Sequence, residues 1–150
     1  MKRIMIDPTK CTGCKNCVIA CMQSHRKDEG DTYNLNLTDP SNESRNYIHE
    51  DGKGGYLPLF CRHCDQAECV TTCMSGAMQK DSETGHVRYN EERCGACFMC
   101  VMNCPYGLNK PDFLTKSKVV KCDFCIDDDE DPNCVKSCPV EAITIEEVTK

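Results

Sequence analysis

Apolar side chains are sparse along the chain and fall into short groups, so the elements that they predict are short. Ile4 and Ile6 lie two residues apart near the start, as Ile143 and Ile145 do within Ala142–Ile145 near the end, so each pair falls on one face of an extended segment with period-2 alternation. Such alternation indicates a half-buried strand. We therefore predict a strand over Lys2–Asp7 and another over Ala142–Ile145, and we expect the two to be the edges of one small antiparallel sheet.

Two further pairs of strands are predicted as hairpins. They are Asn46–Glu50 with Gly55–Phe60, and Ala77–Lys80 with His86–Tyr89. Asp51-Gly52 lies between the first pair, and Asp-Gly between two strand-like runs is a strong hairpin signal. The second pair is joined by Asp-Ser-Glu-Thr-Gly at 81–85, which is rich in turn-forming residues. With one helix predicted over Val18–Ser24, the pattern favours a loop-rich α+β fold.

The spacing of the cysteines indicates bound metal, which the pattern of apolar positions alone does not. The chain has 150 residues and 16 cysteines, which fall into four runs of four. Cys94, Cys97, Cys100 and Cys104 follow the pattern C-x2-C-x2-C-x3-C and precede Pro105, which is typical of bacterial ferredoxins that bind a 4Fe–4S cluster. The other runs are Cys11, Cys14, Cys17 and Cys21 (x2, x2, x3); Cys61, Cys64, Cys69 and Cys73 (x2, x4, x3); and Cys122, Cys125, Cys134 and Cys138 (x2, x8, x3).

The spacing has a mechanical reason. A short loop with small residues such as Gly95 and Ala96 lets three thiolates point at one cluster. We expect the fourth cysteine on the first turn of a helix that points away, toward a neighbouring cluster. Proline is tolerated early in a helix and follows the third and fourth runs. The residue after Cys21 and after Cys73 is methionine, so the first and second runs depart from the ferredoxin pattern at this position.

The order of the runs predicts how they pair. The second and third runs enclose a hairpin and form one unit, which leaves the first and fourth runs for each other. The predicted ligand sets are Cys11, Cys14, Cys17 and Cys138; Cys122, Cys125, Cys134 and Cys21; Cys61, Cys64, Cys69 and Cys104; and Cys94, Cys97, Cys100 and Cys73. The chain 1–150 is then a single domain of two nested ferredoxin-like units: an outer half, residues 1–24 plus 117–150, an insertion, 25–60, and an inner half, 61–116.

Composition and charge limit the possible partners. The hydrophobic fraction is 39% with the cysteines included, and there is no tryptophan, so we expect folding to depend on bound metal. No stretch approaches the ~20 apolar residues that cross a bilayer, and the start lacks an apolar signal region. We therefore expect no membrane insertion and a reducing cytoplasm, where cysteines are metal ligands. The net charge of −6 argues against nucleic acid and favours a partner surface with basic patches.

Four runs in this nested order, with Cys-Arg-His-Cys at Cys61–Cys64 and Cys-Met-Ser-Gly-Ala-Met at Cys73–Met78, resemble a known family. It comprises the four-cluster electron-transfer subunits of molybdopterin oxidoreductases, formate dehydrogenases, hydrogenases and carbon monoxide dehydrogenase. Cys97–Gly107 looks most like the ferredoxin-like partner of carbon monoxide dehydrogenase. The resemblance covers nearly the whole chain except about residues 25–46. It implies four 4Fe–4S clusters and no catalysis by this chain. Electrons would pass one at a time between a catalytic redox enzyme (carbon monoxide dehydrogenase, hydrogenase, formate dehydrogenase or a flavin oxidoreductase) and a second acceptor or donor.

Other uses of these cysteines fit the spacing less well. C-x2-C pairs are typical of zinc sites, but zinc does not need the third and fourth cysteines of each run. A disulfide framework belongs to secreted proteins. An enzyme that binds substrate at an open iron would have a run with three cysteines, and every run here has four. The motifs that bind nucleotides are also absent from the sequence.

Several residues near the cysteines have open roles. His63 lies within a cluster loop, and because the cysteine set is complete we expect it to hydrogen-bond a sulfur or the backbone. Five basic residues either raise cluster potentials or are simply solvated: Lys10, Lys15, Arg62, Arg93 and Lys121. Five methionines are expected to pack softly around the clusters: Met22, Met74, Met78, Met99 and Met102. We favour a surface insertion over a docking arm for 25–60, and a solvated loop over a docking site for the acids Asp127–Asp131.

Overall fold

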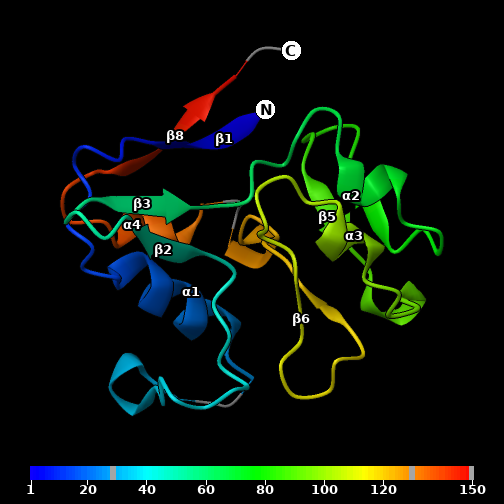
Figure 1. Ribbon diagram of the computed structural model, residues 1–150, viewed down its shortest axis with the longest axis horizontal. Coiled ribbons are helices and arrows are strands. Elements are labelled where there is room, and N and C mark those ends of the chain that lie inside the picture. Colours follow the sequence, from blue (N-terminus) through cyan, green and yellow to red (C-terminus); the bar gives the residue numbers. More distant parts are fainter. Residues whose placement is uncertain (28–29, 129–130, 149–150) are drawn as a thin grey trace.

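The computed structural model describes residues 1–27, 30–128 and 131–148, and within them every element is short (Figure 1). The helices are α1 (Asn16–His25), α2 (Glu68–Thr71), α3 (Met99–Met102) and α4 (Asn133–Lys136). The strands are β1 (Lys2–Ile6), β2 (Tyr47–Glu50), β3 (Tyr56–Leu59), β4 (Met78–Lys80), β5 (Val87–Tyr89), β6 (Lys110–Pro111), β7 (Val119–Val120) and β8 (Ile143–Glu147). Three 3-10 turns lie at Thr32–Asn34, Glu91–Arg93 and Ile126–Asp128.

The strands pair as two-stranded antiparallel sheets. β1 pairs with β8, with Ile4 opposite Ile145 and Ile6 opposite Ile143, so the predicted sheet between the two ends of the chain is confirmed. The hairpins β2–β3 and β4–β5 are confirmed as well. The sequence did not predict the pairing of β6 with β7, because strands of two residues are too short to show alternation. One residue of β6 is also a proline, Pro111.

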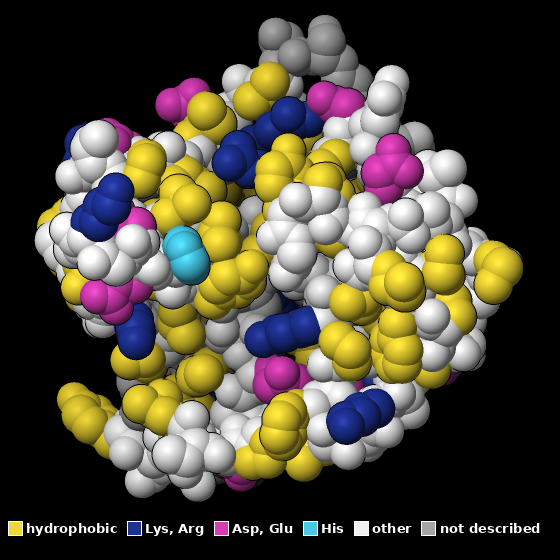
Figure 2. Space-filling view, in the orientation of Figure 1, with side chains coloured by type: hydrophobic (Ala, Val, Ile, Leu, Met, Phe, Trp, Pro, Cys, Tyr) yellow, Lys and Arg dark blue, Asp and Glu magenta, His cyan; other side chains and the backbone are white. Residues whose placement is uncertain are grey.

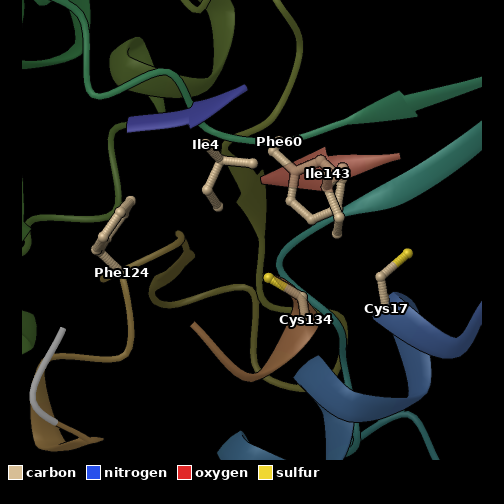
Figure 3. Packing of buried hydrophobic residues seen from close by; sticks show 6 residues of the cluster. All are labelled: Ile4, Cys17, Phe60, Phe124, Cys134 and Ile143. Atoms are coloured by element: carbon tan, nitrogen blue, oxygen red, sulfur yellow. The ribbon is translucent and has the colours of Figure 1, made fainter. Parts of the chain in front are cut away.

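The helices also meet in pairs from distant parts of the chain. α1 contacts α4, and α2 contacts α3. Figure 1 shows β1, β8, β2, β3, α1 and α4 on one side of the molecule, and α2, α3 and β5 on the other. Each side has its own apolar cluster. One contains Ile4, Phe60, Phe124 and Ile143 beside Cys17 and Cys134 (Figure 3), and the other contains Ala67, Met78, Val87, Cys100 and Val119.

The position of the fourth cysteine differs from our prediction in three of the four runs. Cys73, Cys104 and Cys138 follow α2, α3 and α4 instead of starting a helix, so that expectation is wrong for three runs. The chain must reverse after these cysteines, and Gly76 and Gly107 take positive φ angles of 67° and 61° that favour glycine. Proline also ends the helical path after two of the three, because it lacks the N–H that a helix needs.

The first run behaves differently because nothing stops its helix. Cys21 lies inside α1, which confirms the predicted helix over Val18–Ser24 and extends it to His25. For the segment 25–60 we expected a surface insertion, but part of the segment is buried. Ser44, Asn46 and Phe60 are buried, and the Asn46 side chain donates a hydrogen bond to the carbonyl of Cys17 over 3.3 Å. The insertion therefore packs on the outer elements.

Candidate metal centres

The structure brings the sixteen cysteines into four groups, each with three cysteines of one run and one of another. Three groups each line a cavity: the Cys14 group, Cys11, Cys14, Cys17 and Cys138; the Cys64 group, Cys61, Cys64, Cys69 and Cys104; and the Cys97 group, Cys73, Cys94, Cys97 and Cys100. In the Cys134 group, Cys21, Cys122 and Cys125 interact electrostatically with Cys134. The thiols thus lie in the four predicted sets, while metal binding to each set stays a prediction.

The protein environment disfavours free thiolates in these groups. Burial, followed by the neighbouring thiols, raises the pKa of Cys17 to about 12 and that of Cys100 to about 11. Burial raises the pKa of Cys134 too, and the thiols of Cys122, Cys21 and Cys125 raise it further. Four negative charges could not gather in such a place without a cation. Metal binding removes this conflict, because a bound metal keeps its thiol ligands deprotonated.

Backbone N–H groups donate to the sulfur of the fourth cysteine in every run. The donors are Arg45 to Cys21 (3.2 Å), Met78 to Cys73 (3.4 Å), Leu108 to Cys104 (3.4 Å) and Ala142 to Cys138 (3.3 Å). A hydrogen bond to a charged acceptor favours the charged form. Each sulfur that completes a group therefore has a backbone hydrogen-bond donor directed at it.

Asp123 organises the surroundings of the Cys134 group. Its carboxylate accepts hydrogen bonds from the Cys125 N–H (3.0 Å), from His25 Nε2 (3.2 Å) and from the Arg45 guanidinium. Burial alone would raise the pKa of Asp123, but the His25 hydrogen bond and the Arg45 charge outweigh it and hold that pKa well below its usual range. Burial likewise opposes a charged His25, yet its bonds to Asp123 and Cys21 raise its pKa to about 9.

The sequence did not predict this cluster of Asp123, His25 and Arg45. Asp123 lies between two cysteines of one C-x2-C pair, a position that could have marked it. Nothing local in the sequence marks His25 or Arg45, because they reach Asp123 across 98 and 78 residues. Cys125 joins His25 and Asp123 in a set of atoms close enough to hold a metal ion, but Cys125 already belongs to the Cys134 group.

His63 is buried where the two sides of the molecule meet. Its ring lies edge-on to His86 and Phe124, with ring centroids 4.9 Å and 5.6 Å away. Nδ1 accepts a hydrogen bond from the Val87 N–H over 2.9 Å, which confirms the predicted backbone bond and leaves the proton on Nε2. Nε2 is buried and has no partner within the part of the chain that the structure describes. His63 lines the cavity of the Cys64 group, so a buried N–H donor fits the sulfur of a cluster there.

Among the five basic residues beside the cysteines, Lys121 alone is buried, with 4% of its surface exposed. Lys10, Lys15, Arg62 and Arg93 are exposed.

The methionines near the cysteines differ in their exposure. Met78 is buried as predicted, but Met74 and Met102 are 83% and 78% exposed, so packing around the clusters is wrong for these two. Figure 2 shows apolar side chains exposed on both sides of this face of the molecule.

The four groups follow one another in a fixed order. Electrostatic interactions join Cys100 to Cys69, Cys122 to Cys61, and Cys134 to Cys17. The order is therefore the Cys97 group, the Cys64 group, the Cys134 group and the Cys14 group. The two exposed cysteines, Cys97 and Cys14, belong to the two end groups.

The structure tests two further predictions only in part, those on the acids Asp127–Asp131 and on membrane insertion. Of the acids Asp127–Asp131, residues 129 and 130 lie outside the described residues, and Asp131 forms an exposed ion pair with Lys136 over 3.2 Å. Within the described ranges, no helix has the length and apolar character that a membrane crossing requires.

Comparison with known proteins identifies the family. A profile of the 4Fe–4S dicluster domain matches residues 53–148, and one of the 4Fe–4S binding domain matches residues 4–21. The B subunit of the anaerobic dimethyl sulfoxide reductase of Escherichia coli K12 is 37% identical over 92% of this chain and 69% of its own length. The putative electron transport protein YsaA of the same strain is 30% identical over 98% of this chain and 90% of its own length.

A solved structure shares the fold across the whole chain. It is the active site complex BamBC of benzoyl coenzyme A reductase in complex with zinc, with a TM-score of 0.51 and 28% identity. The match covers 100% of this chain and 82% of that one. The predicted family resemblance is confirmed, and the finer likeness to the partner of carbon monoxide dehydrogenase stays a prediction.

Proposed function

Because the chain belongs to the family of 4Fe–4S dicluster proteins, we propose that it holds four 4Fe–4S clusters, one on each cysteine group. It is an iron–sulfur electron-transfer subunit related to the B subunit of dimethyl sulfoxide reductase. When bound, each cluster supplies a one-electron redox couple. The observation that carries the proposal is the crossed grouping, in which each set of four thiols draws on two different runs, as with Cys11 and Cys138, which are 127 positions apart in the sequence.

The exposed end groups support transfer between two partners. Cys14 and Cys97 reach the surface, whereas the cysteines of the two middle groups are buried or half-buried. A partner can therefore approach either end of the row without entering the protein. We propose a catalytic redox subunit at one end and a second donor or acceptor at the other, with no substrate chemistry in this chain.

The nested arrangement of two ferredoxin-like units is part of the same proposal. It is supported by the pairing of β1 with β8, by the contacts of α1 with α4 and of α2 with α3, and by the two separate apolar clusters. A reducing cytoplasm suits a chain that must keep sixteen thiols available for metal. The net charge of −6 does not suit nucleic acid as a partner.

Metal analysis of protein purified without oxygen tests the proposal. We expect about sixteen iron and sixteen acid-labile sulfide per chain, and a brown colour that bleaches on reduction. Stoichiometric zinc without sulfide would instead show a structural metal scaffold. A pull-down under the same conditions should recover a subunit of a redox enzyme, and one-electron reduction of the bound chain by that subunit's substrate would establish the direction of transfer.

A further inference from the structure

Lys121 lies at the junction of the two middle cysteine groups. Its Nζ is 3.5 Å from the sulfur of Cys61, a member of the Cys64 group. The same Nζ donates a hydrogen bond over 2.8 Å to the carbonyl of Cys122, a member of the Cys134 group. The side chain is nearly enclosed, with 4% of the residue exposed. One ammonium thus contacts both groups at the point where they are adjacent.

This ammonium lacks the partner that a buried cation normally has. Within the ranges that the structure describes, no carboxylate forms an ion pair with Lys121. Burial of an unpaired charge is costly, so buried lysines are nearly always paired. The available compensation is the sulfur of the two groups. The Lys121 charge acts on Cys69 and Cys122, one thiol in each group, and lowers the pKa that burial raises.

The matched positions elsewhere in the chain do not share this geometry. Lys10 and Arg93 each precede the first cysteine of a run, as Lys121 does, yet both are exposed. Arg62 follows Cys61 directly, but its guanidinium turns outward over the ring of Tyr106, 5.4 Å from the centroid. A basic residue beside a cysteine is therefore common here, and a buried one between two groups occurs once within the described residues.

We propose that Lys121 is a positioning residue that sets the reduction potentials of the two middle clusters. The inference rests on the proposed function, since it requires clusters on the Cys64 and Cys134 groups. Each reduction adds one electron, supplied by a partner or by dithionite in an assay, and no proton. The added negative charge is stabilised by an ammonium 3.5 Å from one ligand sulfur. The two middle clusters are then reduced more readily than the same groups would be without Lys121.

The test is a redox titration of Lys121→Met, which keeps the length of the side chain and removes its charge. The controls are Arg62→Met, an exposed cation beside the same Cys61, and wild type. Iron and sulfide are counted first, and the four potentials are then followed anaerobically by EPR. We expect two of the four clusters of Lys121→Met to show at least a tenfold lower ratio of reduced to oxidised form at a fixed potential, which is about 59 mV for one electron. The other two clusters, and all four in Arg62→Met, should titrate as in wild type.

The other outcomes separate the role of Lys121 from the proposed function. Full cluster content with four unchanged potentials would overturn the role of Lys121 and leave the proposed function intact. Zinc, or fewer than four clusters in the wild type, would overturn both. If Lys121→Met loses clusters, Lys121→Arg keeps the charge and is titrated instead. Two middle potentials near those of wild type would then support the proposal, and lowered ones would overturn it.

Discussion

The backbone N–H of Arg45 donates a hydrogen bond to the sulfur of Cys21 over 3.2 Å, across 24 residues of sequence. The equivalent sulfurs of Cys73, Cys104 and Cys138 each receive an N–H from four or five residues ahead. The three local donors come from turns that follow short helices. After Cys21 the helix continues, and the insertion returns to supply the missing donor. The insertion, which we expected to be a surface segment, therefore contributes a hydrogen-bond donor to the Cys134 group.

Arg45→Pro tests this role, because proline keeps the chain length and removes the N–H. We expect the cluster on the Cys134 group to be lost or destabilised, with up to about four of sixteen iron missing. Arg45→Ala is the matched control for the backbone donor, since it keeps the N–H and removes only the guanidinium. Equal iron content and equal EPR spectra for Arg45→Pro and Arg45→Ala would show that the N–H has no role.

The crossed grouping predicts which cysteine substitutions share a phenotype. Cys21→Ala should remove the same EPR component as Cys122→Ala, although the two residues are 101 positions apart. Cys11→Ala should remove a different component, although Cys11 and Cys21 belong to one run. In the same way, Cys73→Ala should match Cys94→Ala. If Cys21→Ala and Cys11→Ala lost the same component, ligation would follow the runs and the exchange would be refuted.

The features that could be predicted from the sequence are those that residues close together in the chain determine. Alternation predicted β1 and β8, and Asp51-Gly52 predicted the hairpin of β2 and β3, because neighbouring residues determine these features. The spacing of the cysteines predicted the four runs, because short loops limit where a thiol can point, and the order of the runs predicted how they combine into four groups. These predictions needed no knowledge of how distant segments pack.

The features that the sequence did not predict depend on distant segments. Asp123 meets His25 and Arg45 only after α1 and the insertion have packed on the fourth run. Lys121 and Lys10 both directly precede the first cysteine of a run, yet only Lys121 is buried. Its burial results from the packing of the two sides of the molecule against each other. The exposure of Met74 and Met102 follows from the same limit, since an apolar residue beside a cysteine can face either the cluster or the solvent.

Asp123→Asn should lower the stability of the holoprotein, because the substitution removes the negative charge to which both His25 and Arg45 donate hydrogen bonds. Hydrogen bonds to charged groups contribute about 1.5–3 kcal/mol each, and since Asp123 is partly exposed we expect a loss near the lower figure. The rate at which the brown colour bleaches in urea should rise about tenfold. Asp131→Asn removes the exposed pair with Lys136 and should leave that rate nearly unchanged. Identical rates for both variants would mean that Asp123 contributes no more than a surface charge.

Removal of the metal should collapse the fold. The two apolar clusters contain cysteines as members, and the elements around them are mostly two to five residues long. Metal binding then supplies much of the folding free energy. After iron chelation without oxygen, we expect amide resonances with little dispersion and a loss of near-ultraviolet circular dichroism. Sharp, dispersed resonances in the apoprotein would show a core that is stable by itself.

The acids Asp127–Asp131 give the last prediction, which concerns docking. They lie in the loop between Cys125 and Cys134, and the cysteines of that loop belong to a middle group of the row, not to either exposed end. A partner that approaches Cys14 or Cys97 has no need of this loop, and the part of it that the structure describes includes the exposed Asp127. We therefore expect Asp127→Asn, Asp128→Asn and Asp129→Asn, combined in one variant, to leave electron transfer to the native partner unchanged across an ionic-strength series. Steering by these acids would instead give the wild type a faster rate at low salt and a steeper fall as salt rises. A flatter salt dependence in the variant would place a partner on this loop and would require a route into the row through the Cys134 group.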